Sequence, residues 1–200
     1  MMFDRLRKYV VEYSSQDITE EEFSLIKQAF KLKKIRKHQY YLQEGDVCKY
    51  IAFVASGAMR QYSVDSNGHE HIIRFGIENW WMGDYESLKM LTPSKYNIDA
   101  VEDSELLLIT NGGMQELKTK IPAIARMMEI LDERSFIANQ RRVHAAISYS
   151  AEERYTELLN TYPVFFQRFP QSMIASYLGI TPETLSRIRK QLHAKRAEAS

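Results

Sequence analysis

The stretch from 171 to 190, QSMIASYLGITPETLSRIRK, constrains the fold most, because its apolar residues recur at the spacing of two short helices. Ile174 and Leu178 stand four residues apart, as neighbours on one helix face do. Gly179 follows and can adopt the left-handed conformation that ends a helix. The pair Thr181-Pro182 can start the next helix, with Thr as the cap and Pro at the first position, where a missing N–H costs nothing. This pattern predicts a helix-turn-helix.

The second of these helices has a polar outer face. On this face Glu183 and Arg187 are side by side. The carboxylate of a glutamate can accept a hydrogen bond from cytosine N4, and the guanidinium of an arginine can donate two hydrogen bonds, to guanine O6 and N7. From Arg168 to Arg196 there are six Lys or Arg residues and one Glu, a local formal charge of +5 that favours phosphates. The candidate DNA contacts are Thr181, Glu183, Thr184, Ser186, Arg187 and Lys190. The alternative is an ordinary helical hairpin with a solvated Glu–Arg pair.

Composition limits the remaining possibilities. The chain has 200 residues, enough for one large or two small domains, and its net charge is only +1, so any nucleic-acid surface must be local. Cys48 is the single cysteine, which excludes an intrachain disulfide and a four-cysteine metal or iron–sulfur site. No apolar run approaches the roughly 20 residues of a membrane helix. The charged start, MMFDRLRKYV, does not fit a signal peptide, so we expect a cytoplasmic protein without a membrane span.

Residues 31–110 show short alternating stretches separated by glycines about every ten residues, a pattern typical of an antiparallel barrel or roll. Asn67-Gly68 is a strong hairpin turn signal. The expected strands are Tyr40–Leu42, Tyr50–Val54, Met59–Val64, His71–Phe75 and Leu106–Ile109. Helices over 3–12 and 19–30 are expected to cover one end of the roll.

Two polar features of the roll are expected to be structural. The basic run from Lys31 to Lys37 is interpreted as a solvated strand face. His69 and His71 alternate with Glu70 and can face one side of a strand. Because two histidines alone do not make a metal site, we expect no metal.

Residues 114–147 are predicted to form one long helix with a heptad seam. The seam, expected to be the dimer interface, is Leu117, Ile121, Ile124, Met128, Leu131, Ser135 and Ala138. Phe136, Val143 and Ile147 form another stripe. We expect one stripe to contact the same helix of a second subunit and the other stripe to contact the chain's own domains. The alternative is that this segment is a single helix in the core of one chain. A short helix is expected over 151–161, ended by Pro163.

The order of roll, long helix and helix-turn-helix resembles the CRP/FNR family of bacterial regulators. The resemblance is carried by Glu44-Gly45-Asp46, by Ser56-Gly57, by Asp65 with Gly68 and Glu70, and by the segment from Gly179 to Lys190. It implies an α+β chain: a sensor roll with a cyclic-nucleotide-binding fold over 1–113, a dimerisation helix over 114–147 and a DNA-binding domain over 148–200. It also implies a homodimer on a two-fold DNA site, with Glu183, Thr184 and Arg187 on the recognition helix and RNA polymerase as a further partner.

The sequence departs from the family's nucleotide-binding cassette. The family's Phe-Gly-Glu, whose Glu holds the ribose hydroxyl, is Met82-Gly83-Asp84 here. Its Arg-Ser-Ala, whose Arg neutralises the cyclic phosphate, falls at Ser94-Lys95-Tyr96, where the Arg is missing. We therefore expect no cyclic AMP and no cofactor, but another small molecule or none. The candidate pocket residues are Trp81, Gly83, Asp84, Tyr85, Lys95 and Tyr96.

The family usually continues into a β-hairpin wing, and the chain stops ten residues after Lys190, so a domain without a full wing is expected. The single cysteine also does not fit the family's iron–sulfur branch. A dimeric transcription regulator is the favoured function, and a ligand-sensing module that binds protein instead of DNA is the alternative. No catalytic motif is visible, so an enzyme is not expected.

Overall fold

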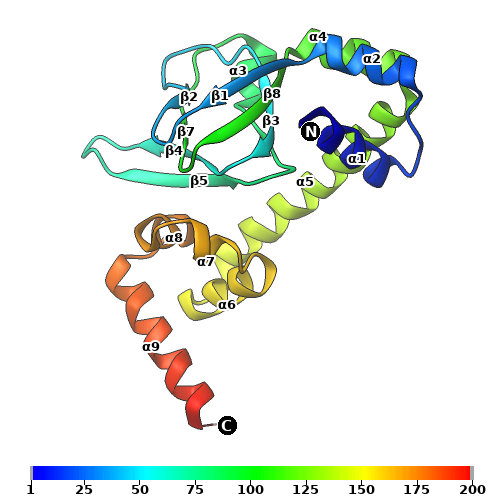
Figure 1. The fold of residues 1–200 in the computed structure, drawn as a ribbon. Helices are drawn as coiled ribbons and strands as arrows, with labels where there is room; N and C mark the ends of the chain where they lie inside the picture. Colours follow the sequence, from blue (N-terminus) through cyan, green and yellow to red (C-terminus); the bar gives the residue numbers. More distant parts are fainter. Residues whose placement is uncertain (1, 199–200) are drawn as a thin grey trace. The chain divides into compact units, whose positions relative to one another are not determined.

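The computed structural model describes residues 2–198, with the side chains of 2–192 and 194. It consists of two compact units, Met1–Ser63 with Ile73–Ser135, and Val64–Ile72 with Phe136–Ser200. The helices are α1 (Met2–Ser14), α2 (Glu20–Ala29), α3 (Tyr85–Met90), α4 (Asn111–Lys120), α5 (Pro122–Ser148), α6 (Ala151–Thr161), α7 (Phe165–Arg168), α8 (Gln171–Leu178) and α9 (Pro182–Glu198) (Figure 1). The strands are β1 (Lys31–Ile35), β2 (Tyr40–Leu42), β3 (Ile51–Ser56), β4 (Met59–Val64), β5 (Glu70–Gly76), β6 (Trp81–Met82), β7 (Asn97–Ala100) and β8 (Ser104–Ile109).

The predicted antiparallel roll is confirmed. It has two four-stranded sheets, ordered β1-β8-β3-β6 and β2-β7-β4-β5 (Figure 1). Both sheets contribute to a buried core, in which Phe53, Ile98 and Leu107 are fully enclosed, and successive residues of β3 and β8 are buried because these strands are covered on both faces. The turn at Asn67-Gly68 is also as expected, since Gly68 has φ +82° and donates its N–H to the Asp65 carbonyl at 3.0 Å.

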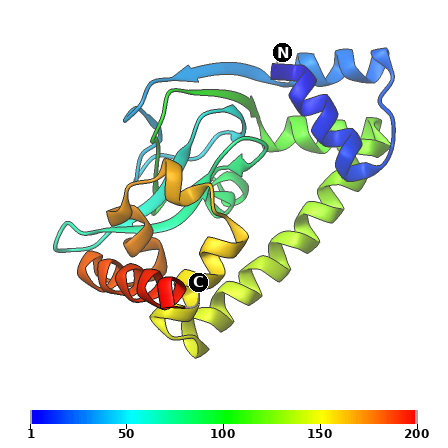
Figure 2. The same cartoon turned by 60° about the horizontal axis from the view of Figure 1, so that its bottom comes forward.

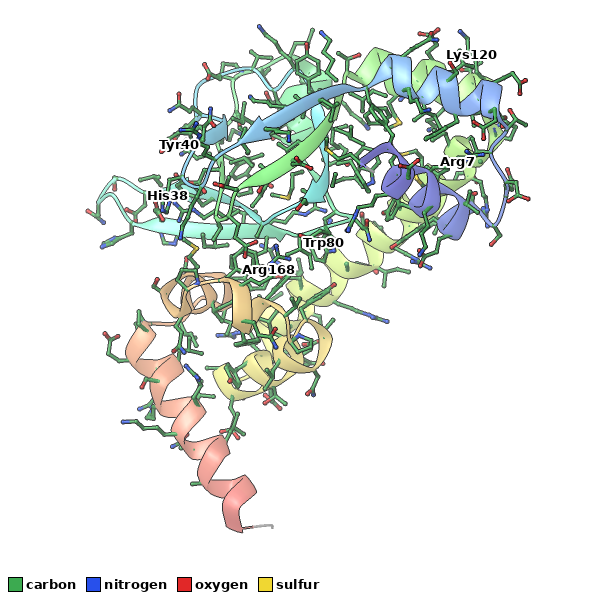
Figure 3. The ribbon with its side chains drawn as sticks, viewed as in Figure 1. Arg7, His38, Tyr40, Trp80, Lys120 and Arg168 are labelled. Atoms are coloured by element: carbon green, nitrogen blue, oxygen red, sulfur yellow. The ribbon has the colours of Figure 1, made fainter. Side chains whose placement is uncertain are left out.

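Helices cover one end of the roll, as predicted. Leu6 and Val10 of α1 are fully buried, and the neighbouring Tyr9 ring lies 5.2 Å from the Phe53 ring between centroids. α2 and α4 pack side by side (Figure 1). Figure 3 shows Arg7 of α1, whose guanidinium donates at 2.6 Å both to Glu20 Oε1 and to the Ile18 carbonyl, tying α1 to the start of α2.

The prediction of one helix over 114–147 is wrong. α4 ends at Lys120, where the Ile121 N–H still donates to the Leu117 carbonyl at 2.8 Å, and Pro122 begins α5. The apolar spacing continues across this break because both helices bury one side. Proline has no N–H for an intrahelical bond and restricts the residue before it to extended conformations, which Ile121 adopts at φ −128°.

The second unit contains the predicted helix at 151–161, which is α6. Ser150 and Glu153 form a capping box at its start, with N···O distances of 2.7 and 3.2 Å. Arg154 donates to the carbonyls of Leu178 at 3.2 Å and Tyr149 at 2.9 Å, so α6 holds the end of α8. α7 was not predicted. Figure 2 shows α6–α9 from a second direction.

Ser56-Gly57 forms a turn that only glycine fits. Gly57 has φ +96°, and a Cβ there would lie 2.5 Å from the Asp103 carbonyl oxygen and 2.7 Å from the Ser104 Cα. We expect Gly57→Ala to lower the free energy of unfolding by about 3 kcal/mol, from the left-handed backbone plus the overlap. Gly68→Ala is the matched control: its φ is +82°, but nothing lies within 4 Å, so it should cost about 1 kcal/mol. Urea unfolding of both variants measures the difference, and equal losses would contradict this packing.

Candidate nucleic-acid interface

The turn between α8 and α9 has the predicted geometry. Gly179 ends α8 at φ 67°, and the Ile180 N–H donates to the Ala175 carbonyl at 3.0 Å. Thr181 Oγ1 accepts from the Thr184 N–H at 3.2 Å, which caps the start of α9. The inner apolar set is buried, from Ile174 and Ala175 on α8 to Leu185 on α9. The two helices are therefore fixed to each other by their shared core and by both ends of the turn.

Among the described residues, the outer face of α9 is exposed to solvent. Of the predicted DNA contacts, Thr181, Glu183, Ser186, Arg187 and Lys190 are exposed, while Thr184 is half-buried. Glu183, Ser186, Arg187 and Lys190 also line a shallow depression of the surface, together with Pro182 and Gln191. Gln191 was missed by the sequence analysis, although its place four residues after Arg187 extends the same face.

Two of the predicted contacts have defined roles within the helix start. The Thr181 hydroxyl caps the start of α9 by accepting the Thr184 N–H. The main role of Thr181 is therefore to position the helix, and its hydroxyl is already engaged within the protein. Hydrogen bonds from its own backbone N–H and from Thr181 lower the pKa of Glu183 below its ordinary value. The Glu183 carboxylate is therefore ionised at neutral pH and can act as an acceptor.

The cassette of the roll is closed by its own hydrogen bonds. Asp84 caps α3, where its Oδ1 accepts from the N–H groups of Glu86 at 3.0 Å and Ser87 at 3.2 Å. Its Oδ2 accepts from the Ser94 hydroxyl at 2.8 Å. Asp84 and Ser94 are 6% and 3% exposed. The two positions that would hold a ribose and a cyclic phosphate thus bond to each other, and neither offers a positive charge, so these residues do not fit a cyclic nucleotide.

The other predicted pocket residues lie in three different settings. Trp81 is in the roll core, where its ring lies 5.2 Å from the Phe53 ring and 6.2 Å from the Phe30 ring between centroids. Lys95 is exposed, with its Nζ 3.8 Å from Glu86 Oε1. Gly83 is enclosed against β3. Tyr85 is the first residue of α3 and is exposed, whereas the Tyr96 N–H donates to Ser94 Oγ.

The positions of the predicted dimer seam divide into three groups by their burial. Leu117, Ile121 and Ile124 are at most 3% exposed in the core of their own unit. The interface prediction is corrected at these positions, because buried side chains offer no surface to a partner. Met128 and Leu131 pack partly against the same core. Ser135 and Ala138 are exposed, as is the second stripe: Phe136 64%, Val143 59% and Ile147 80%.

His69 and His71 do share one side, as expected from their alternation. Both approach Asp65 Oδ2, His69 Nδ1 at 3.4 Å and His71 Nε2 at 3.1 Å. Hydrogen bonds lower the pKa of the Asp65 carboxyl below its ordinary value, and the largest contribution comes from the backbone N–H of His69. Within the described residues, no group of three or more His, Cys, Asp or Glu side chains could hold a metal ion. In the same part of the chain, no helix is both long and apolar enough for a bilayer.

Comparison with known proteins supports the arrangement of roll and helices. Residues 32–120 match the cyclic nucleotide-binding domain family. The regulatory protein HlyX of Actinobacillus pleuropneumoniae is 26% identical over 185 residues, 86% of this chain and 75% of HlyX. The transcriptional activator protein FnrA of Stutzerimonas stutzeri is 25% identical over 169 residues, 78% of this chain and 68% of FnrA. The structure of FixK2 from Bradyrhizobium japonicum matches with a TM-score of 0.67 at 20% identity, over 83% of this chain and 85% of FixK2.

These sequence relatives are regulatory proteins and not enzymes, and the fold shared with FixK2 extends over the roll and the helical part. Residues 32–120 thus match the cyclic nucleotide-binding domain family, and the chain as a whole is similar to bacterial transcription regulators of the CRP/FNR type.

Proposed function

We propose that the protein is a homodimeric, cytoplasmic regulator that reads a two-fold-symmetric DNA site with the outer face of α9. The observation that carries this proposal is the exposed group Glu183, Arg187 and Lys190 on a helix whose start is capped and whose inner face is buried. A rigid helix with donors and an acceptor on its outer side suits the major groove. In a dimer the two recognition helices would be spaced about 34 Å, one turn of duplex. RNA polymerase is the proposed further partner.

Salt dependence separates DNA recognition from binding to a protein. If the exposed cations of α9 contact phosphates, the logarithm of the binding constant should fall linearly with the logarithm of salt, by about 0.9 for each phosphate neutralised. Fluorescence anisotropy with a selected DNA fragment between roughly 50 and 200 mM salt measures this slope. A flat response would instead favour an apolar protein interface at the helical hairpin.

The second copy of the chain is proposed to cover the exposed apolar side of α5. Phe136, Val143 and Ile147 are large apolar residues left in water, and Ser135 and Ala138 allow a second helix to approach closely.

We expect Phe136→Asp to raise the dimer dissociation constant about 100-fold or more, because the variant loses apolar burial and places a charge in the interface. Sedimentation analysis measures the change. Thr119→Asp, which adds the same charge on the exposed side of α4, should leave the dimer intact. An unchanged dimer in Phe136→Asp would exclude this face as the interface.

We also propose that DNA binding does not depend on a cyclic nucleotide. The support is the Ser94–Asp84 hydrogen bond, which occupies the groups that a ribose and a phosphate would need. Anisotropy titrations with and without cyclic AMP should give the same DNA affinity. A gain in affinity with cyclic AMP would contradict the proposal.

A further inference from the structure

A cavity of about 570 Å³ opens beside the edge strand β1, within the first unit. Its walls come from β1, from β2 and from the segment that leads into β3, and the volume falls within the range of small-molecule sites. The lining residues are Lys31, Leu32, Lys33, Tyr41, Leu42, Asp46, Val47, Cys48, Lys49, Tyr50 and Leu108. None of them belongs to the cassette between Met82 and Ser94.

Three lysines give this cavity its charge. Lys31 and Lys33 alternate along β1 and so point to one side, the side of their cross-strand partners Leu108 and Leu106. Lys49 adds a third cation, and Asp46 is the single carboxylate among the lining residues.

In the described part of the chain, no carboxylate forms an ion pair with Lys31, Lys33 or Lys49. Lys34, on the opposite side of β1, shows the contrast, because its Nζ lies 2.6 Å from Glu105 Oε1. The cavity therefore gathers three lysines that no described carboxylate pairs with.

Two tyrosine rings stand beside the cations. The Nζ of Lys31 lies 5.5 Å from the Tyr50 ring centroid and 3.4 Å from the Tyr50 hydroxyl, and the Nζ of Lys33 lies 5.7 Å from the Tyr41 ring centroid. Lysine over a tyrosine face is a weakly attractive arrangement that leaves the ammonium hydrogens able to bind an anion. The flat rings supply an apolar surface for the rest of a ligand.

The walls are held in place before any ligand binds. The Tyr41 hydroxyl donates to the Tyr50 carbonyl at 2.5 Å, and burial raises the pKa of Tyr41, so this hydroxyl keeps its proton. The segment before β3 is fixed from its other side, since the Asp46 carbonyl accepts from the Ser94 N–H at 2.8 Å and the Cys48 N–H donates to Ser87 Oγ at 2.9 Å. A preformed site loses less ordering entropy on binding.

We propose that this cavity binds a small aromatic anion, with its carboxylate or phosphate on the lysines and its ring against Tyr41 and Tyr50. Leu42, Cys48 and Leu108 are at most 7% exposed and close the apolar floor. The inference concerns the roll alone and does not depend on DNA recognition.

The test is calorimetric titration of the full chain with 2-naphthoate. The double variant Lys31→Gln/Lys33→Gln should bind 2-naphthoate about tenfold more weakly than the unsubstituted protein, because two partly exposed charge contacts are lost. The matched control, Lys34→Gln with Lys37→Gln, removes the same charge from exposed positions outside the cavity and should change affinity less than about twofold. The neutral 2-naphthamide should bind at least about tenfold more weakly than 2-naphthoate.

Comparing 2-naphthoate with 2-naphthyl phosphate then identifies which anionic group the site prefers. The proposal is overturned if 2-naphthoate does not bind, if both double variants lose affinity equally, or if the amide binds as tightly as the carboxylate. Thermal unfolding of both double variants confirms that they are folded, so that a loss of binding can be assigned to the site.

Discussion

Asp99→Ala is expected to lower the free energy of unfolding by about 3–5 kcal/mol, because it breaks a buried ion pair with Arg60 that has two hydrogen bonds. The two residues oppose each other across β4 and β7, and the guanidinium donates to both carboxylate oxygens, at 2.9 and 3.0 Å. Arg60 is 8% exposed and Asp99 5%. The Arg60 Cζ also lies 4.2 Å from the Tyr62 ring centroid, so the roll shields the cation from water.

An exposed ion pair of the same roll gives the matched comparison. Lys34 and Glu105 oppose each other across β1 and β8, with a 2.6 Å contact, but their side chains are 75% and 34% exposed. Glu105→Ala should therefore cost less than about 1 kcal/mol. Denaturant unfolding of Asp99→Ala and Glu105→Ala measures both losses. Similar values for the two variants would show that burial does not set the strength of the Arg60–Asp99 pair.

Arg187→Ala is expected to weaken specific DNA binding by about 1–3 kcal/mol for each half-site, because arginine can form two hydrogen bonds to one guanine. In a dimer both half-sites lose this contact, so the affinity for the full site should fall by roughly 30-fold or more. Arg187 is exposed on α9 one turn after Glu183, and Leu185 and Ile188 on either side of it hold the helix in the core. The substitution should therefore leave the fold unchanged.

Arg36→Ala is the control for Arg187→Ala, since Arg36 is also an exposed arginine but lies in the roll. It removes the same charge without touching α9, and DNA affinity should change little. Anisotropy titrations at one fixed salt concentration compare the two variants with the unsubstituted protein. Equal effects of Arg36→Ala and Arg187→Ala would mean that only total charge matters and that α9 does not read bases.

The helix-turn-helix could be predicted from the sequence because its signals are local. Gly179 and Thr181 need only their own neighbours to end one helix and cap the next, and the structure shows both functions. The outer face followed from helix periodicity alone, apart from Gln191. The short strands β6 and β7 were not predicted, because each forms only by pairing with distant segments. β6 pairs with β3, and β7 pairs with β2 and β4.

Features that depend on tertiary packing were harder to predict. The heptad spacing continues across Ile121 and Pro122, so periodicity alone joined α4 to α5. Pro122 was the signal that a new helix begins. The Ser94–Asp84 bond joins residues on either side of α3, and no sequence pattern shows that their side chains meet. The cavity beside β1 likewise depends on strand pairing, and the sequence alone showed only a basic run.

Recognition of a specific DNA sequence by α9 can be tested by selecting genomic DNA fragments with the purified protein, without added ligand and at near-physiological salt. We expect the unsubstituted protein and the Arg36→Ala variant to recover one palindromic motif, and the Arg187→Ala variant to recover none. Failure to enrich any motif, both without ligand and with small molecules extracted from cells, would contradict sequence-specific recognition by α9. That result would instead favour a helical hairpin that binds protein.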